Sequence, residues 1–128
     1  YGPLSVASNA LKLPNGMYLQ YPHLRYTSGE FLYDSGRNGI TRTHGPRLVE
    51  NIVQALARIV ITDQMLAIQN IPGISVVLTV HDEIIALGSD KNADETLATI
   101  MAIMKQPPAW CTELPLDAEG AYSKIYNK

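Results

Sequence analysis

"SVVLTVHDEIIALGS", residues 75–89, consists of two apolar stretches separated by His81, Asp82 and Glu83. Each stretch is rich in Val, Ile and Leu and has the length of a strand, so the segment predicts a β-hairpin. Tight hairpin turns usually contain Gly or Asn, because their backbone needs positive φ values. Here ionisable side chains occupy the turn, and such a departure from local preference indicates a candidate functional site.

Two helices are predicted, one before and one after this hairpin. The first spans 46–70, PRLVENIVQALARIVITDQMLAIQN, with Pro46 tolerated in its first turn and a Pro-Gly pair after its end. The second is expected over about 93–105, where Asn92 and Glu95 resemble a capping box.

The rest of the chain predicts strands and loops. Residues 1–45 are rich in Gly, Pro, Asn and Tyr and form a loop-rich β lead-in, whereas 46–128 form one structural unit. The hairpin strands are expected over about 74–80 and 84–88, and a final edge strand and tail over 114–126. The predicted fold class is α+β, an antiparallel sheet whose hairpin packs against the long helix and the second helix.

The composition is that of a single globular domain. The chain has 128 residues, of which 46% are hydrophobic and 17% charged. Its single cysteine, Cys111, indicates no disulfide framework, and no apolar run approaches the roughly 20 residues needed to span a bilayer. We therefore expect a cytoplasmic location and no membrane partner. The chain begins with Tyr1 rather than Met, so we expect it to be part of a longer polypeptide.

Charge is distributed unevenly along the chain. Residues 1–60 carry six basic and three acidic side chains, a net +3, while 61–128 carry four basic and nine acidic, a net −5. A polyanion would be attracted to the first part, and the second could hold cations. Random scatter of charges remains the alternative interpretation.

A polar stripe runs along the long helix. Its members recur at steps of four, three, four and four: Arg47, Asn51, Gln54, Arg58 and Thr62. We call this stripe the polar lane. Most other positions are apolar, so we expect the helix to be largely buried with only this lane exposed. Amide side chains suit base edges and Arg suits phosphates, which favours nucleic acid, although an ordinary solvated face remains the alternative.

The hairpin tip has the chemistry of a metal site. Asp82 and Glu83 offer the oxygen ligands that Mg²⁺ takes, and Mg²⁺ is often held by one or two carboxylates together with substrate phosphates. A solvated turn remains the alternative.

An apolar strand, "VHDE" and a second apolar strand resemble the motif C hairpin of the family A, DNA polymerase I-like, DNA polymerases. The helix segment "ENIVQALARIVITDQM" resembles the palm helix that precedes motif C, particularly in bacteriophage members. "LPLDAEGAYSKIYNK" is similar to their carboxy-terminal tail, and "LKLPNGMYLQYP" to the segment that follows the fingers. The resemblance covers most of the chain from about Leu11 onward.

The resemblance implies roles for the tip and the lane. Asp82 would be a catalytic carboxylate that binds Mg²⁺, Glu83 an accessory acid at the site, and His81 would help to position the primer terminus. Gln54 and Asn51 would contact the minor groove of the primer–template end. Roles for Arg58 and Arg47 in binding DNA are our own inference from the lane.

The implied reaction is attack of a primer 3′-hydroxyl on the α-phosphate of a deoxynucleoside triphosphate at a two-metal site. It needs a second aspartate, from motif A, and the Arg, Lys and Tyr of the fingers helix, and we find neither in this sequence. Asp34 has the wrong surroundings and is assigned no catalytic role. We therefore expect the isolated chain to be inactive and its partners to include the missing N-terminal part of the polymerase.

Two other functions compete with this interpretation. A DNA-binding or interaction module could keep the palm fold without the chemistry. A metal-dependent phosphohydrolase would need further ligands near the tip, and His23 and His44 show no ligand spacing. Aromatic side chains could stack on bases, but packing at strand and loop edges is their commoner role, so they are left out of the predicted site. They are Trp110, Tyr18, Tyr21, Tyr26 and Tyr33.

Overall fold

The computed structural model describes residues 2–126. It divides into two compact units, Tyr1–Ile59 and Val60–Lys128, with the division inside the long helix.

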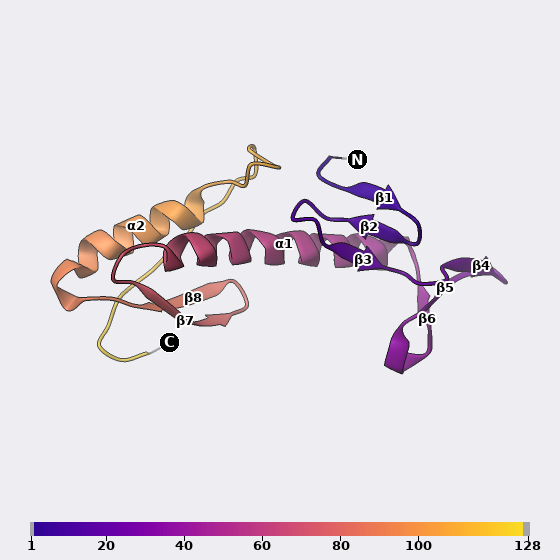
Figure 1. Ribbon diagram of the computed structural model, residues 1–128, viewed down its shortest axis with the longest axis horizontal. Coiled ribbons are helices and arrows are strands. Elements are labelled where there is room, and N and C mark those ends of the chain that lie inside the picture. The colour runs from indigo at the N-terminus through magenta and orange to yellow at the C-terminus, as the bar shows by residue number, and fades with distance from the viewer. Residues whose placement is uncertain (1, 127–128) are drawn as a thin grey trace. The chain divides into compact units, whose positions relative to one another are not determined.

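The first unit contains two antiparallel sheets of three strands each (Figure 1). The first sheet has the order β1-β2-β3, formed by β1 Ser5–Ala7, β2 Ala10–Lys12 and β3 Tyr18–Gln20. The second has the order β4-β5-β6, formed by β4 Arg25–Thr27, β5 Glu30–Asp34 and β6 Ile40–Thr43. A 3-10 turn, η1 Gly36–Asn38, connects β5 to β6.

Tight turns explain why these strands are short. Among the described residues, four that are not glycine have positive φ: Asn9, His23, Ser28 and His81. The first three lie in the turns of this unit; His23 follows Pro22, and Ser28 precedes Gly29. The unit's small core includes Leu13 and Tyr21, and the Tyr21 ring meets Tyr33 edge-on at a centroid distance of 5.1 Å.

The long helix, α1, spans Gly45–Gln69. The backbone N–H of Arg47 donates to Nδ1 of His44 at 3.2 Å. The imidazole thus caps the helix by accepting from one of the backbone N–H groups that have no partner within the first turn. The expectation that α1 is largely buried is wrong for the described residues. Val49 and Val53, in the part of α1 that belongs to the first unit, are 59% and 58% exposed.

Judged by length and composition alone, α1 is long and apolar enough to cross a membrane; it is the one such helix within residues 2–126. The core helix of a soluble protein passes the same test, and the polar lane interrupts the apolar surface of α1.

The second unit combines the end of α1 with a hairpin and a second helix (Figure 1). The hairpin is formed by β7 Ser75–Val80 and β8 Glu83–Leu87, and a 3-10 turn, η2 Asp90–Asn92, leads into α2 Ala93–Lys105. Ile68 is fully buried, and Val60 and Ile74 are nearly so. The side chain of Gln64 on α1 donates to the carbonyl of Met104 on α2 at 2.8 Å, which joins the two helices.

The α+β class, the antiparallel pairing and the two helices are confirmed, but the strands form three separate sheets rather than one. The expected edge strand over 114–126 is wrong, because the described tail forms no strand. Its side chains bind α2 instead: Lys105 pairs with Asp117 at 3.0 Å, and the Tyr122 hydroxyl donates to Asp94 at 2.9 Å.

The capping box at the start of α2 is also wrong. Asn92 is the N-cap residue, but its side chain makes no capping hydrogen bond. The η2 turn begins three residues earlier, and there the Ser89 hydroxyl accepts from the backbone N–H of Lys91 at 3.3 Å. The entry to the helix is therefore capped one turn upstream.

Candidate functional site

The hairpin tip consists of a two-residue connection. Val80 pairs with Glu83, which leaves His81 and Asp82 between the strands. His81 has φ +55°, in the left-handed region that favours Gly or Asn. The chain therefore holds a histidine where local backbone energetics would prefer glycine, and strain of this kind is concentrated at functional sites.

The carboxyl groups at the tip are open to solvent. His81 and Asp82 are exposed and Glu83 is half-buried. Within residues 2–126, no hydrogen bond or ion pair engages the side chain of any of the three. A bulge between Val76 and Leu78 shifts the strand register below the tip, and bulges increase the local twist of a hairpin.

The residues at the tip fit part of a magnesium site. Asp82 and Glu83 are adjacent hard oxygen donors, and one or two carboxylates completed by water and phosphate oxygens is the usual arrangement for Mg²⁺. Among the described residues there is no group of three or more His, Cys, Asp or Glu side chains that could hold a metal ion. The described residues thus supply no complete set of protein ligands for a metal ion, at the tip or elsewhere.

The polar lane forms on α1 as the spacing predicts. Arg47, Gln54 and Arg58 are exposed, while Asn51 and Thr62 are half-buried. The Gln54 amide donates to Glu50 on the same helix at 3.3 Å, and the Asn51 amide donates to the Tyr21 hydroxyl at 3.2 Å. Asn51 therefore has a structural partner within the first unit. The proposed contacts of all these residues with DNA stay predictions.

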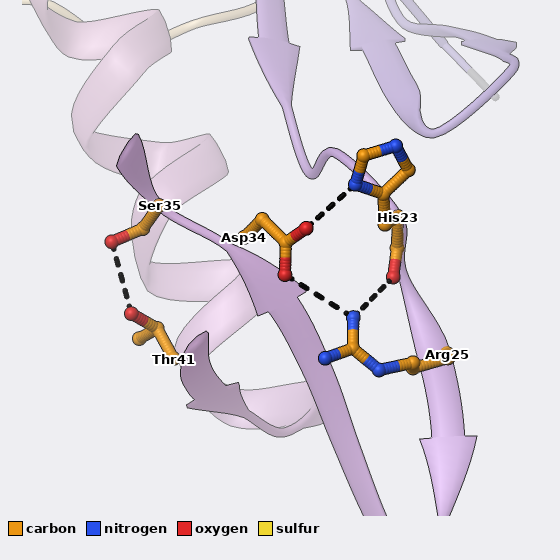
Figure 2. Close-up of polar contacts among 5 residues, drawn as sticks. All are labelled: His23, Arg25, Asp34, Ser35 and Thr41. Atoms are coloured by element: carbon orange, nitrogen blue, oxygen red, sulfur yellow. Dashed lines mark hydrogen bonds and ion pairs between the residues drawn. The ribbon is translucent and has the colours of Figure 1, made fainter. Parts of the chain in front are cut away.

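One polar cluster was missed by the sequence reasoning (Figure 2). Nδ1 of His23 lies 2.6 Å from a carboxylate oxygen of Asp34, and the Arg25 guanidinium bonds the other Asp34 oxygen at 3.3 Å and the His23 carbonyl at 2.9 Å. The hydrogen bond with His23, reinforced by Arg25, holds the pKa of Asp34 below its usual range. Asp34 is therefore ionised at neutral pH.

A local signal for this cluster exists in the sequence. Leu24 donates its N–H to the Tyr21 carbonyl at 3.2 Å, which closes a turn with Pro22 in second place and His23, φ +53°, in third. This is the pattern of a type II turn, whose third residue is usually Gly or Asn. The anomaly resembles that at the hairpin tip. Asp34, eleven positions away in sequence, meets His23 because its N–H donates to the Pro22 carbonyl at 2.8 Å.

The fold and the tip thus define an α+β chain with an exposed acidic hairpin and a basic first unit. Over an alignment of 128 residues the chain is 36% identical to the DNA polymerase of Bacillus phage SP02. The alignment covers 92% of this chain and 19% of that polymerase, so the chain spans about a fifth of the length of this relative. No protein-family model and no solved structure matches the sequence. The chain is therefore similar to a segment of a phage DNA polymerase.

Proposed function

We propose that this chain is the carboxy-terminal palm portion of a family A, template-directed DNA polymerase. The carrying observation is the similarity to a phage DNA polymerase over 92% of the chain. The hairpin supports it, because an exposed Asp82 and a half-buried Glu83 occur at the turn where the resemblance requires the catalytic acids. Proposed partners are primer–template DNA, deoxynucleoside triphosphates and the N-terminal part of the polymerase, in the cytoplasm of the bacterial host.

In the proposed reaction, the primer 3′-hydroxyl attacks the α-phosphate of the incoming nucleotide and pyrophosphate leaves. Asp82, with Glu83 beside it, would hold Mg²⁺, which when bound stabilises the charge that develops on the reacting phosphate oxygens. His81 would position the primer terminus from its exposed place in the turn, where its backbone has φ +55°. Gln54 and Arg58 would hold the primer–template end.

The isolated chain is not expected to extend a primer. Two carboxylates at one tip supply only part of a two-metal site, and the described residues bring no third ligand to them. The same observation favours a second candidate function, a DNA-binding module that keeps the palm fold without catalysis. Such a module would bind primer–template DNA with little response to Mg²⁺.

Primer extension by the native polypeptide that contains these residues tests the proposal. Asp82→Ala should abolish extension while primer–template affinity stays within about twofold, because the carboxylate acts on the reacting phosphates rather than on the duplex. Asp90→Ala, which removes an exposed carboxylate from the η2 turn, is the matched control and should keep normal extension. Extension that persists in Asp82→Ala would contradict the assignment.

A further inference from the structure

The first sheet carries a polar face that none of the roles above uses. Tyr18 and Gln20 are two residues apart on β3, so their side chains lie on the same face. Lys12 is the register partner of Tyr18, and Ala10 that of Gln20, which places these two on that face as well. Tyr18 is 47% exposed, and Lys12 and Gln20 are exposed.

An open groove of about 600 Å³ follows this face. Its lining includes Ser8 and Asn9 from the β1–β2 turn, Ala10, Tyr18 and Gln20 from the sheet, and His23 from the turn after β3.

The side chain of His23 is 78% exposed and is held on one side by a hydrogen bond. Its Nδ1 is bonded to the ionised Asp34, which fixes the ring, and Nε2 lies on the opposite side of the ring (Figure 2). The turn that carries it is closed by two backbone hydrogen bonds, from Leu24 to Tyr21 and from Asp34 to Pro22. One hydrogen-bonding atom of His23 is thus presented from a fixed position.

The charge of this unit favours an anionic ligand. Residues 1–60 carry a net +3, and two of their three acidic side chains are already paired, Glu30 with Arg42 and Asp34 with Arg25 and His23. Within residues 2–126, Lys12 has no ion-pair partner. An exposed aromatic ring beside a basic side chain and fixed hydrogen-bonding groups is the composition of surfaces that bind single strands of nucleic acid.

We propose that this face of the β1-β2-β3 sheet binds single-stranded DNA, with a base stacked on Tyr18 and the backbone of the strand along Lys12 and His23. The choice of DNA rests on the proposed function; the choice of a single strand rests on the exposed ring, because a base can stack on a side chain only when it is not already stacked in a duplex.

The test measures binding of a fluorescein-labelled oligodeoxythymidine to the full chain by fluorescence anisotropy. Tyr18→Ala should weaken binding about tenfold, whereas Tyr18→Phe, which keeps the ring, should bind like the wild type. The matched control is Tyr126→Ala, which removes a ring of similar exposure, 55%, from the tail and should have no effect. Equal affinity of Tyr18→Ala and wild type, or an equal loss in Tyr126→Ala, would overturn the proposal.

Charge is tested separately. Lys12→Gln should weaken binding several-fold more than Arg37→Gln, which removes the same charge from the η1 turn of the same unit. An equal loss of affinity in both variants would mean that the unit attracts any polyanion, and it would overturn the proposal of a defined site. Photocrosslinking of an oligonucleotide containing 5-iodouracil should yield a peptide modified at Tyr18, and crosslinks confined to other residues would also overturn it.

These outcomes are independent of the polymerase assay. Asp82→Ala should leave single-strand binding by the chain unchanged. If Tyr18-dependent binding is found but extension persists in Asp82→Ala, the DNA site stands and the polymerase assignment fails. If extension depends on Asp82 but Tyr18→Ala binds single strands normally, the assignment stands and this site fails.

Discussion

At the residue scale, two histidines occupy backbone positions that would suit glycine. His81 at the hairpin tip and His23 in the turn after β3 both have positive φ, at 55° and 53°. His81 was predicted as a site residue because its turn lacks a glycine. The turn at His23 shows the same kind of anomaly, but His23 was not predicted. The partner of His23, Asp34, could not be predicted, because the two are eleven positions apart in the chain and are brought together only by the pairing of β4 with β5.

Replacement of His81 by glycine should stabilise the fold. A left-handed backbone costs a residue with a Cβ roughly 1 kcal/mol, and glycine removes that cost. Thermal or chemical unfolding of His81→Gly should therefore give a higher free energy of unfolding than the wild type. Asp82→Gly is the control, since φ of Asp82 is not positive and glycine should bring no gain there. A loss of stability in His81→Gly would contradict this explanation.

The pKa of Asp34 predicts a pH dependence of stability. Because that pKa is lowered in the folded chain, the ionised carboxylate contributes stability at neutral pH, and the contribution disappears as pH falls below the usual carboxyl range near pH 4. Asp34→Asn should thus be less stable than the wild type at pH 7, and the difference should shrink as the pH approaches 3. Asp90→Asn, outside this cluster, serves as the control. A stability difference between Asp34→Asn and the wild type that grew toward low pH would contradict a lowered pKa of Asp34.

At the element scale, local pattern predicted the helices well and the tail poorly. The second helix, 93–105, was predicted with its observed bounds, and the first within one residue at each end, because apolar periodicity and a Pro-Gly stop act within the chain segment itself. The tail was wrongly predicted as a strand. Its position depends on side-chain contacts of Asp117 and Tyr122 with α2, which no local pattern encodes.

The contact between α1 and α2 depends on one buried amide. Gln64 is 7% exposed and donates to the Met104 carbonyl. Gln64→Ala should lower the free energy of unfolding by about 2 kcal/mol, through the lost hydrogen bond and the cavity left behind. Gln54→Ala on the same helix is the matched control and should change stability by less than about 0.5 kcal/mol, because its side chain is exposed. Equal effects of the two substitutions would contradict the role of Gln64.

The lane prediction is tested on the same helix. Gln54→Ala should reduce the affinity of the native polypeptide for primer–template DNA several-fold, because the hydrogen bond from its amide to a base edge is lost. Gln69→Ala, outside the lane, is the control for removal of an amide from α1; because the Gln69 amide oxygen accepts from the backbone N–H of Val76 at 2.8 Å, the folded fraction of this variant is measured as well. An unchanged affinity for DNA in Gln54→Ala would favour the alternative that the polar lane is an ordinary solvated face of the helix.

At the scale of the whole molecule, the described chain leaves much apolar surface uncovered. Val49 and Val53 on α1 and Leu78 on β7 are all at least half exposed. The sequence predicted a buried helix because its apolar content is high, but the described residues cover only part of it. The chain corresponds to about a fifth of the length of a larger relative. Other parts of a longer polypeptide would cover the apolar surface that is exposed here.

We propose that these residues belong to a larger DNA polymerase, and the intact mass of the native polypeptide in the fraction that supports templated DNA synthesis tests this proposal. We expect one polypeptide that contains this sequence, with a mass several times 14.1 kDa. A native polypeptide of about 14.1 kDa, recovered without any polymerase subunit and without synthetic activity, would contradict it.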